Sequence, residues 1–312
     1  MYKSYGLIEQ HFHGAFGVDF MSCSVNDIVD VSVEILKHGI TRIYPTLMTG
    51  DLADIKSQIS KIKKAKEIQP AESAEISGIH LEGPFINSVK SGIHNPDYIL
   101  APTVENYSKI EDEFIKIVTI APELDLNHDL CKYLNQKGVR VSAGHTMASD
   151  LSDCTCATHL FNAMGGITHK ASNTVTSALL NENLFVEVIA DGNHIIPDVL
   201  DLIFKVKSND KVILISDALP DTLTDKSESV FAGQKVCYKN GAFYNSEGTL
   251  GGSGMLVSSI IQKLINSKFV KKPETLLKMA SENILKYLGI QNNGFVYFDD
   301  NYNVIKTEIL PI

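Results

Sequence analysis

Short apolar runs alternate with amphipathic stretches from the start of the chain to about residue 265. This alternation predicts βα units, and consecutive βα units build a parallel sheet. Several of the runs are continuous and β-branched, as expected for strands buried on both faces. Eight strands are expected, at Tyr5–Glu9, Thr41–Pro45, Ile76–Leu81, Ile115–Ile120, Val139–Ala143, Ala157–Phe161, Phe185–Ala190 and Val212–Ser216. The pattern therefore predicts an α/β fold of the (β/α)8 TIM-barrel type.

The stretches between these runs carry helix signals. Ser24 is placed to cap a helix that ends at Gly39, and Asp51 is placed to cap the next one. Proline suits the first turn of a helix, which favours helices over Pro197–Lys207 and from Pro273 to about Tyr287.

Two regions depart from this alternation of strand and helix patterns. Residues 220–250 are rich in turns, with hairpin strands expected around Gln234–Tyr238 and Ala242–Tyr244. The pattern of the segment Gly294–Leu310 predicts two short strands joined by a turn. Both regions are expected to form small β additions to the barrel.

The length of the chain fits one barrel. With 312 residues and 44% hydrophobic content, it can bury a sizeable core, and barrels of this size commonly form one domain. We assign residues 1–290 to the catalytic barrel, with the insertion at 220–250. Residues 291–312 are assigned to a short C-terminal β segment, a reduced β appendage.

Charge and cysteine content limit the partners and the cellular compartment that we expect. The formal charge of −9 argues against a nucleic-acid or membrane-surface partner, although an anion could bind at a locally positive site. No stretch approaches the ~20 apolar residues of a membrane span, and the N-terminus lacks the apolar core of a signal peptide. Five cysteines without a framework spacing favour a reducing cytoplasm.

Glu82 and His145 stand just beyond the ends of two predicted strands, and His159 lies within a third, near its end. A TIM barrel carries its chemistry at these C-terminal strand ends. One carboxylate and two imidazoles can hold a divalent ion and leave a position for water. We predict a metal site there, with zinc preferred over iron or another divalent ion. For each histidine alone, the alternative is a hydrogen-bonded structural residue.

His11 and His13 end the first apolar stretch. A His-x-His pair on a strand presents both rings on one face. The pair would complete a second metal site or form a hydrogen-bonding pair at the pocket floor. Asp217 follows the eighth predicted strand, from which a carboxylate can move a proton between water and a leaving group. The alternative role for Asp217 is a helix cap.

Two further signals are less specific. Cys154 and Cys156 precede His159 closely enough to form a zinc cluster, although buried cysteine is common in cores. The glycine-rich stretch Gly248–Gly254 precedes a helical run at Met255–Ile265. Backbone N–H groups in such a loop can bind an anion or a sugar hydroxyl.

A set of short motifs, in one order along most of the chain, resembles the N-acetylglucosamine-6-phosphate deacetylases of the amidohydrolase superfamily. The pieces His-Leu-Glu-Gly-Pro-Phe at 80–85 and Thr-His-Leu-Phe-Asn-Ala-Met at 158–164 are highly specific. The full set is His11–Gly14, Tyr44–Leu47, His80–Phe85, Gly92–Pro96, Ala121–Glu123, Ser142–Thr146, Thr158–Met164, Asp191–His194, Ser216–Ala218 and Gly248–Ser253.

The resemblance implies that Glu82, His145 and His159 bind the catalytic metal, that Asp217 is the acid/base, and that His94 polarises the acetyl carbonyl. Relatives that keep His-x-His can hold a second ion through that pair, so one or two ions per chain are implied. The implied phosphate contacts are the backbone of Asn162 and Ala163, with His194. The implied lining of the sugar pocket is Ile93, Asp191, Leu250, Gly251 and Gly252.

The chain also departs from its relatives. They usually begin with a longer segment that builds part of a β-sandwich, whereas the first strand is expected close to Met1 here. Lys170 stands where relatives carry an Arg that reaches the phosphate in the neighbouring subunit of a homodimer. Lys can neutralise a phosphate but cannot form the bidentate fork. Gln10 stands where many relatives have Asp.

The expected function is metal-dependent hydrolysis of N-acetylglucosamine 6-phosphate to glucosamine 6-phosphate and acetate, in a homodimer. One alternative is deacylation of another N-acyl amino sugar, including an unphosphorylated one, which the change at Lys170 favours. A second alternative is a catalytically silent sugar-phosphate-binding protein. Loss of a metal ligand or of Asp217 would mark that class, and neither has occurred.

Overall fold

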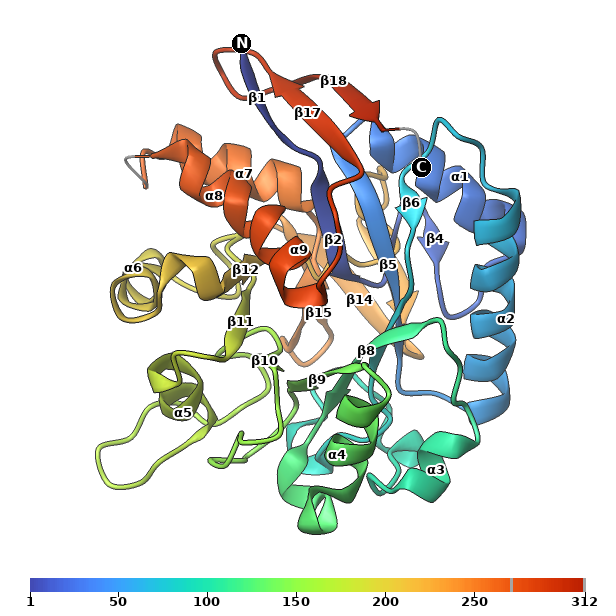
Figure 1. The fold of residues 1–312 in the computed structure, drawn as a ribbon, viewed down its shortest axis with the longest axis vertical. Coiled ribbons are helices and arrows are strands. Elements are labelled where there is room, and N and C mark those ends of the chain that lie inside the picture. The colour runs from blue at the N-terminus through green and yellow to red at the C-terminus, as the bar shows by residue number, and fades with distance from the viewer. Residues whose placement is uncertain (270–271, 311–312) are drawn as a thin grey trace.

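Eight parallel strands form a curled sheet at the centre of the computed structural model, which describes residues 1–269 and 272–310 (Figure 1). Strands that follow one another in the chain lie side by side in the sheet. This arrangement confirms the predicted barrel. The strands are β2 (Leu7–Phe12), β5 (Ile40–Met48), β7 (Ile79–Glu82), β8 (Ile115–Ile120), β9 (Arg140–Ala143), β10 (Cys156–Ala157), β11 (Phe185–Val188) and β12 (Val212–Leu214).

The barrel closes between its first and last strands. The Asp217 N–H donates to the His11 carbonyl at 3.0 Å, and the His13 N–H donates to the Ala218 carbonyl at 2.8 Å. These bonds lie just beyond the end of β12 rather than in a regular ladder. The seam therefore brings His11, His13 and Asp217 together, although they lie far apart in the chain.

Helices surround the sheet, as Figure 1 shows. Ser24 caps the first helix through a capping box and Asp51 caps the second, as predicted. Pro197 opens the sixth helix. The helices are α1 (Val25–Leu36), α2 (Leu52–Ile68), α3 (Val104–Ser108), α4 (Asp129–Gln136), α5 (Thr174–Leu180), α6 (Pro197–Val206), α7 (Val257–Asn266), α8 (Pro273–Met279) and α9 (Glu282–Leu288). Short 3-10 turns lie at Ser88–Lys90, Pro96–Tyr98, Pro122–Leu124, Leu126–His128 and Asn209–Lys211.

The predicted helix from Pro273 to Tyr287 is in fact two helices. The backbone of Ser281 leaves the helical region, which separates α8 from α9. The carbonyl of Ala280 accepts the N–H of Ile8 in the barrel at 2.9 Å. A contact with a strand distant in sequence thus ends a helix whose local pattern would continue.

Two predicted strands are each divided. The first becomes β1 (Tyr2–Tyr5) and β2, with Gly6 between them. A Cβ at Gly6 would lie 2.1 Å from Oγ1 of Thr41, so only glycine allows this close approach. The third becomes β6 (Glu75–Ile76) and β7, and both pair with β5.

The sixth predicted strand is much shorter than expected. Only Cys156–Ala157 forms β10, whereas the prediction ran from Ala157 to Phe161. His159 and Phe161 adopt positive φ values of 28° and 76°, which no strand allows. His159 therefore lies in the turn after the strand and not within it.

Antiparallel sheets flank the barrel. The predicted hairpin belongs to a four-stranded sheet of β13 (Glu228–Phe231), β14 (Gln234–Lys239), β15 (Ala242–Asn245) and β16 (Leu250–Ser253). The glycine-rich stretch is thus partly a strand, β16, and not only a loop. The C-terminal strands β17 (Gly294–Phe298) and β18 (Val304–Ile309) form a three-stranded sheet with β1. A small ribbon pairs β3 (Gly14–Ala15) with β4 (Val18–Asp19).

The described residues contain no helix that combines the length and the apolar character of a membrane span.

Candidate active site

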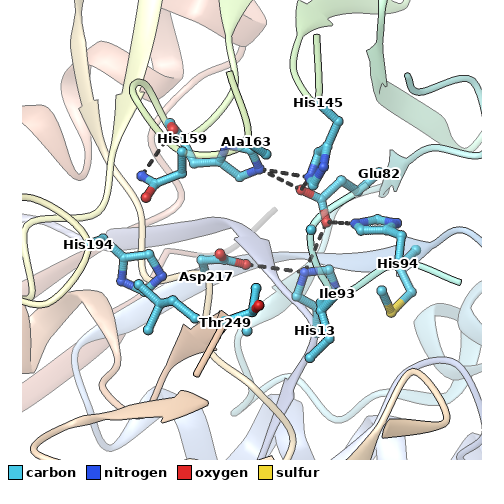
Figure 2. A pocket seen from close by; sticks show the side chains of 15 residues that line it. His13, Glu82, Ile93, His94, His145, His159, Ala163, His194, Asp217 and Thr249 are labelled. Atoms are coloured by element: carbon cyan, nitrogen blue, oxygen red, sulfur yellow. Dashed lines mark hydrogen bonds and ion pairs between the residues drawn. The ribbon is translucent and has the colours of Figure 1, made fainter. Parts of the chain in front are cut away.

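A cavity of about 290 Å³ lies where the barrel strands end. Its wall includes Glu82 after β7, His145 after β9, His159 after β10 and Asp217 after β12. These side chains point toward one another across the cavity in Figure 2. The predicted placement of the candidate residues at strand ends therefore brings them to one site.

Glu82, His145 and His159 converge on a common point. Oε1 of Glu82 lies 3.2 Å from Nε2 of His145 and 3.0 Å from Nε2 of His159. The two Nε2 atoms are 3.1 Å apart. All three side chains are buried, and their ligand atoms meet the spacing expected of a metal-binding group.

The backbone is distorted where it presents these residues. His145, His159 and Asp217 have φ values of 47°, 28° and 53°. Non-glycine residues in this region cost on the order of 1–3 kcal/mol each, and such strained residues are often found at functional sites. The chain turns sharply off each strand, which aims the side chain into the cavity.

The hydrogen bonding of His145 indicates a lone pair directed into the site. Its Nδ1 lies 2.7 Å from the carbonyl oxygen of Lys90, which can only accept. Nδ1 of the neutral ring therefore carries the proton, and Nε2 is left with a lone pair facing His159 and Glu82. In a metal-ligating histidine, a hydrogen bond from the ring nitrogen that does not bind the metal typically fixes the orientation of the ring in this way. The donor set fits a divalent ion such as zinc.

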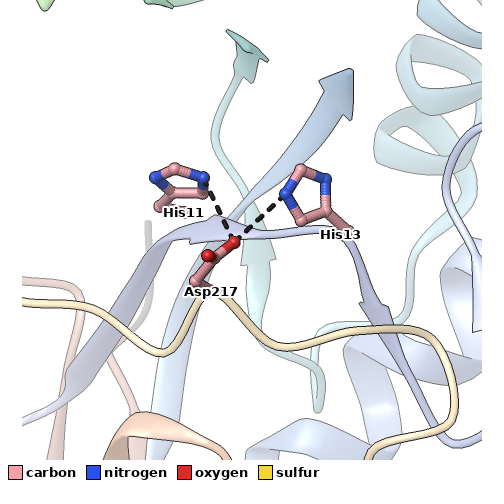
Figure 3. A group of neighbouring side chains, drawn as sticks. All are labelled: His11, His13 and Asp217. Atoms are coloured by element: carbon pink, nitrogen blue, oxygen red, sulfur yellow. Dashed lines mark ion pairs between the residues drawn. The ribbon is translucent and has the colours of Figure 1, made fainter. Parts of the chain in front are cut away.

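His11 and His13 lie beside this group and share Glu82 with it. Nε2 of His11 is 3.3 Å from Oε1 of Glu82, and Nε2 of His13 is 3.2 Å from Oε2. Both rings also face Oδ1 of Asp217, at 3.5 and 3.2 Å (Figure 3). Nε2 of His11 has no hydrogen-bond partner although it is buried. These contacts leave room for an ion between the two rings and Asp217.

The carboxylates dominate the electrostatics of the cavity. Burial opposes the charge on His11, but Glu82, Glu187 and Asp217 outweigh it and raise the pKa of His11 well above its usual value. The pKa of His13 rises to about 9 because hydrogen bonds to Asp217 and Glu82 overcome burial. Burial would raise the pKa of Glu82, but His11 and the other rings hold it well below normal. The site therefore attracts positive charge.

His94 contacts the other carboxylate oxygen of Glu82, not the one that faces His145 and His159. Its Nε2 is 3.2 Å from Oε2 of Glu82. Burial, and then the neighbouring His145, lower the pKa of His94 to about 4. His94 is therefore neutral near pH 7 and can act as a hydrogen-bond donor.

The predicted substrate residues divide into two sets. Those that line the cavity are Ile93, Asn162, Ala163, His194, Leu250 and Gly251. Asp191 lies behind the wall, where its Oδ2 holds Nδ1 of His194 at 2.9 Å. Gly252 follows Gly251 in β16 but is not part of the lining. Lys170 does not line this cavity. It lies on an exposed loop, where it lines a separate surface hollow together with Ile167 and His169.

Several residues of the site were not predicted from the sequence. Glu187, in β11, accepts from Gln10 at 2.6 Å and faces Nδ1 of His11 at 3.0 Å. A carboxylate inside an otherwise apolar predicted strand is the signal that could have revealed Glu187. Met48 and Thr249, which line the cavity, carry no comparable signal.

The cysteine alternative finds no support. The metal-binding groups found among the described residues are built from histidine and carboxylate, and none includes Cys154 or Cys156. Cys156 is fully buried in β10, where its Sγ faces the carbonyl of Ala157 at 3.6 Å.

Comparison with known proteins finds strong similarity to one group of enzymes, although no family model matches the chain. The chain is 33% identical over 298 residues to the N-acetylglucosamine-6-phosphate deacetylase of Bacillus subtilis, covering 91% of this chain and 75% of that protein. It is 24% identical to the N-acetylgalactosamine-6-phosphate deacetylase of Escherichia coli O157:H7, covering 91% and 77%. The structure of N-acetylglucosamine-6-phosphate deacetylase from Thermotoga maritima superposes with a TM-score of 0.89 at 25% identity, covering 98% and 87%.

Proposed function

The chain belongs to the N-acetylglucosamine-6-phosphate deacetylase family, and we propose that it hydrolyses N-acetylglucosamine 6-phosphate to glucosamine 6-phosphate and acetate. The observation that carries this proposal is the convergence of Glu82, His145, His159 and Asp217 in one buried cavity. A binding protein without catalysis would have no need for this strained and costly cluster of charged groups.

Glu82, His145 and His159 would hold a divalent ion, with zinc preferred because nitrogen and carboxylate donors suit it. When bound, such an ion lowers the pKa of a water molecule and polarises the acetyl carbonyl. His11 and His13, with Asp217, would hold a second ion. The buried, unpartnered Nε2 of His11 supports this second assignment.

Asp217 and His94 would carry the proton and charge transfers. Asp217 accepts a proton from the attacking water, whose oxygen forms a bond to the acetyl carbon. As that bond forms, His94 donates a hydrogen bond to the carbonyl oxygen and stabilises its growing negative charge. Asp217 then returns the proton to the sugar nitrogen, the C–N bond breaks, and acetate departs.

The sugar would lie between β16 and the β10 loop. Leu250, Gly251 and Ile93 would contact the ring, since they line the same cavity as Asn162 and Ala163. Gly252 and Asp191 would support this wall from behind. The backbone of Asn162 and Ala163 would hold the phosphate together with His194.

Lys170 would complete the phosphate site from a second subunit. It lies outside the cavity of its own chain. The loop that carries it is exposed, so Lys170 of the partner subunit in a homodimer could reach the phosphate. A cytoplasmic location fits this proposal, because all five cysteines are free.

One observation bears on the alternative substrates. None of the residues that line the cavity in the described parts of the chain is Lys or Arg. The cavity wall therefore supplies no cationic side chain to neutralise a phosphate, and an unphosphorylated N-acetyl amino sugar would also suit it. Separately, the similarity to an N-acetylgalactosamine-6-phosphate deacetylase makes another phosphorylated hexosamine an alternative substrate.

Metal analysis of the purified protein, combined with a substrate panel, tests the proposal. The panel contains the 6-phosphates of N-acetylglucosamine and N-acetylgalactosamine and both unphosphorylated sugars. We expect at least one divalent ion per chain and the highest kcat/KM on N-acetylglucosamine 6-phosphate. Activity confined to the unphosphorylated sugars would select the alternative, and no acetate release from any of them would refute the proposed function.

A further inference from the structure

Thr49, the residue after β5, contacts the Nδ1 edge of the His94 ring. Oγ1 of Thr49 lies 2.9 Å from Nδ1 of His94, and the backbone N–H of Thr49 approaches the same atom with an N···N distance of 3.4 Å. Both residues are buried, with 5% and 2% of their surface exposed. Water is therefore largely excluded from this edge of the ring.

These contacts select one tautomer of His94. A backbone N–H can only donate, so Nδ1 must present a lone pair to it. The hydroxyl of Thr49 can donate to the same lone pair. If Nδ1 carried the proton instead, two N–H groups would face one another at the backbone contact.

The far edge of the ring is compatible with the same tautomer. Nε2 of His94 lies 3.2 Å from Oε2 of Glu82, as the dashed line in Figure 2 marks. Because Nδ1 accepts from Thr49, Nε2 of the neutral ring carries the proton, and this N–H can donate to the carboxylate. Contacts at both edges of the ring therefore agree.

The chain makes room for the hydroxyl of Thr49 at Gly83. Gly83 has a φ of +86°, and a Cβ built there would lie 2.2 Å from Oγ1 of Thr49. A side chain at position 83 would displace the hydroxyl or strain the backbone. Glu82, Gly83 and Thr49 thus form one local arrangement around His94.

We propose that Thr49 is a positioning residue that holds His94 as the Nε2–H tautomer for hydrogen-bond donation to the substrate carbonyl. This inference rests on the proposed function for the identity of that carbonyl, but the tautomer itself does not depend on the substrate. The opposite tautomer would direct a lone pair at the carbonyl oxygen, where negative charge develops.

Thr49→Val and Thr49→Ser separate the hydroxyl from the rest of the side chain. Valine keeps the branched shape but removes the donor, whereas serine keeps the donor. We expect Thr49→Val to lower kcat by roughly ten- to a hundredfold with KM changed less than about twofold, as for loss of a contact made in the transition state. Thr49→Ser should retain kcat to within about threefold. Both variants should keep wild-type metal content, since Thr49 is not a ligand.

Nitrogen-15 NMR of histidine-labelled, zinc-loaded protein reads the tautomer directly, with His94→Gln used to assign the signal. The wild type should show an unprotonated Nδ1 and a protonated Nε2 at His94, and Thr49→Val should show a mixture of the two tautomers. A protonated Nδ1 in the wild type would overturn the inference. Equal tautomer and kcat in wild type and Thr49→Val would also overturn it. The expected tautomers in a protein that releases no acetate would leave this inference standing and refute only the proposed function.

Discussion

Nε2 of His145 and Nε2 of His159 lie 3.1 Å apart, both within 3.2 Å of the same oxygen of Glu82. Because Nδ1 of His145 is bound to a carbonyl, at least one of these two nitrogens presents a lone pair to the other. Two imidazoles and a carboxylate held in this way form a preorganised site for a cation.

Asp217→Asn should lower kcat by roughly 10²–10⁴-fold while the Glu82/His145/His159 metal stays bound, because asparagine keeps the shape of the side chain but cannot shuttle a proton. Steady-state kinetics and metal analysis of the same preparation measure both effects. Asp221→Asn is the matched control: Asp221 is also buried but pairs with Lys226 and does not line the cavity. Near-normal turnover in Asp217→Asn would remove Asp217 from the mechanism.

His159→Ala should lose metal and activity together, since two remaining protein ligands hold a borderline ion poorly against water. Atomic spectroscopy after dialysis measures the metal. The double variant Cys154→Ser with Cys156→Ser should keep full metal content, because neither thiol belongs to a metal-binding group in the structure. If the losses were reversed between these two proteins, the cysteines would form the real site.

His11→Asn combined with His13→Asn should reduce the metal content by about one ion per chain, with partial activity retained at the first site. The reason is that these rings and Asp217 form a group separate from His145 and His159. A calorimetric titration with zinc counts the binding sites. A wild type with one ion and an unchanged count in the double variant would assign His11 and His13 to structure.

Lys170→Ala should lower kcat/KM for the phosphorylated sugar by roughly ten- to a hundredfold, because a hydrogen bond to a charged group contributes about 1.5–3 kcal/mol. The effect on the unphosphorylated sugar should be small. Lys170→Arg should keep or improve the phosphorylated reaction, since the guanidinium fork suits phosphate. Lys306→Ala, in the exposed terminal strand β18, serves as the control.

Sedimentation analysis belongs with the Lys170 test, because the proposed contact crosses between subunits. A dimer in solution is expected. Equal losses on both sugars, or no loss on either, would make Lys170 an ordinary surface lysine. Either result would also strengthen the case for an unphosphorylated substrate.

The order of elements and the general position of the site followed from the sequence. Alternating apolar runs and capping residues such as Ser24 and Asp51 act over a few residues, so local periodicity is enough to predict them. The barrel then places its strand ends at one mouth, which is why Glu82 and His145 could be expected to meet.

Only the tertiary structure decided how the site is assembled. Bonds across the barrel seam bring His11 and His13 to Asp217, and Ala280 ends its helix by accepting the N–H of Ile8. The turn that carries His159 has a positive φ that a β-like apolar run does not reveal. Each of these features depends on hydrogen bonds between residues distant in the chain or on a strained backbone. Local sequence pattern determines neither, because both are fixed by packing of the closed barrel.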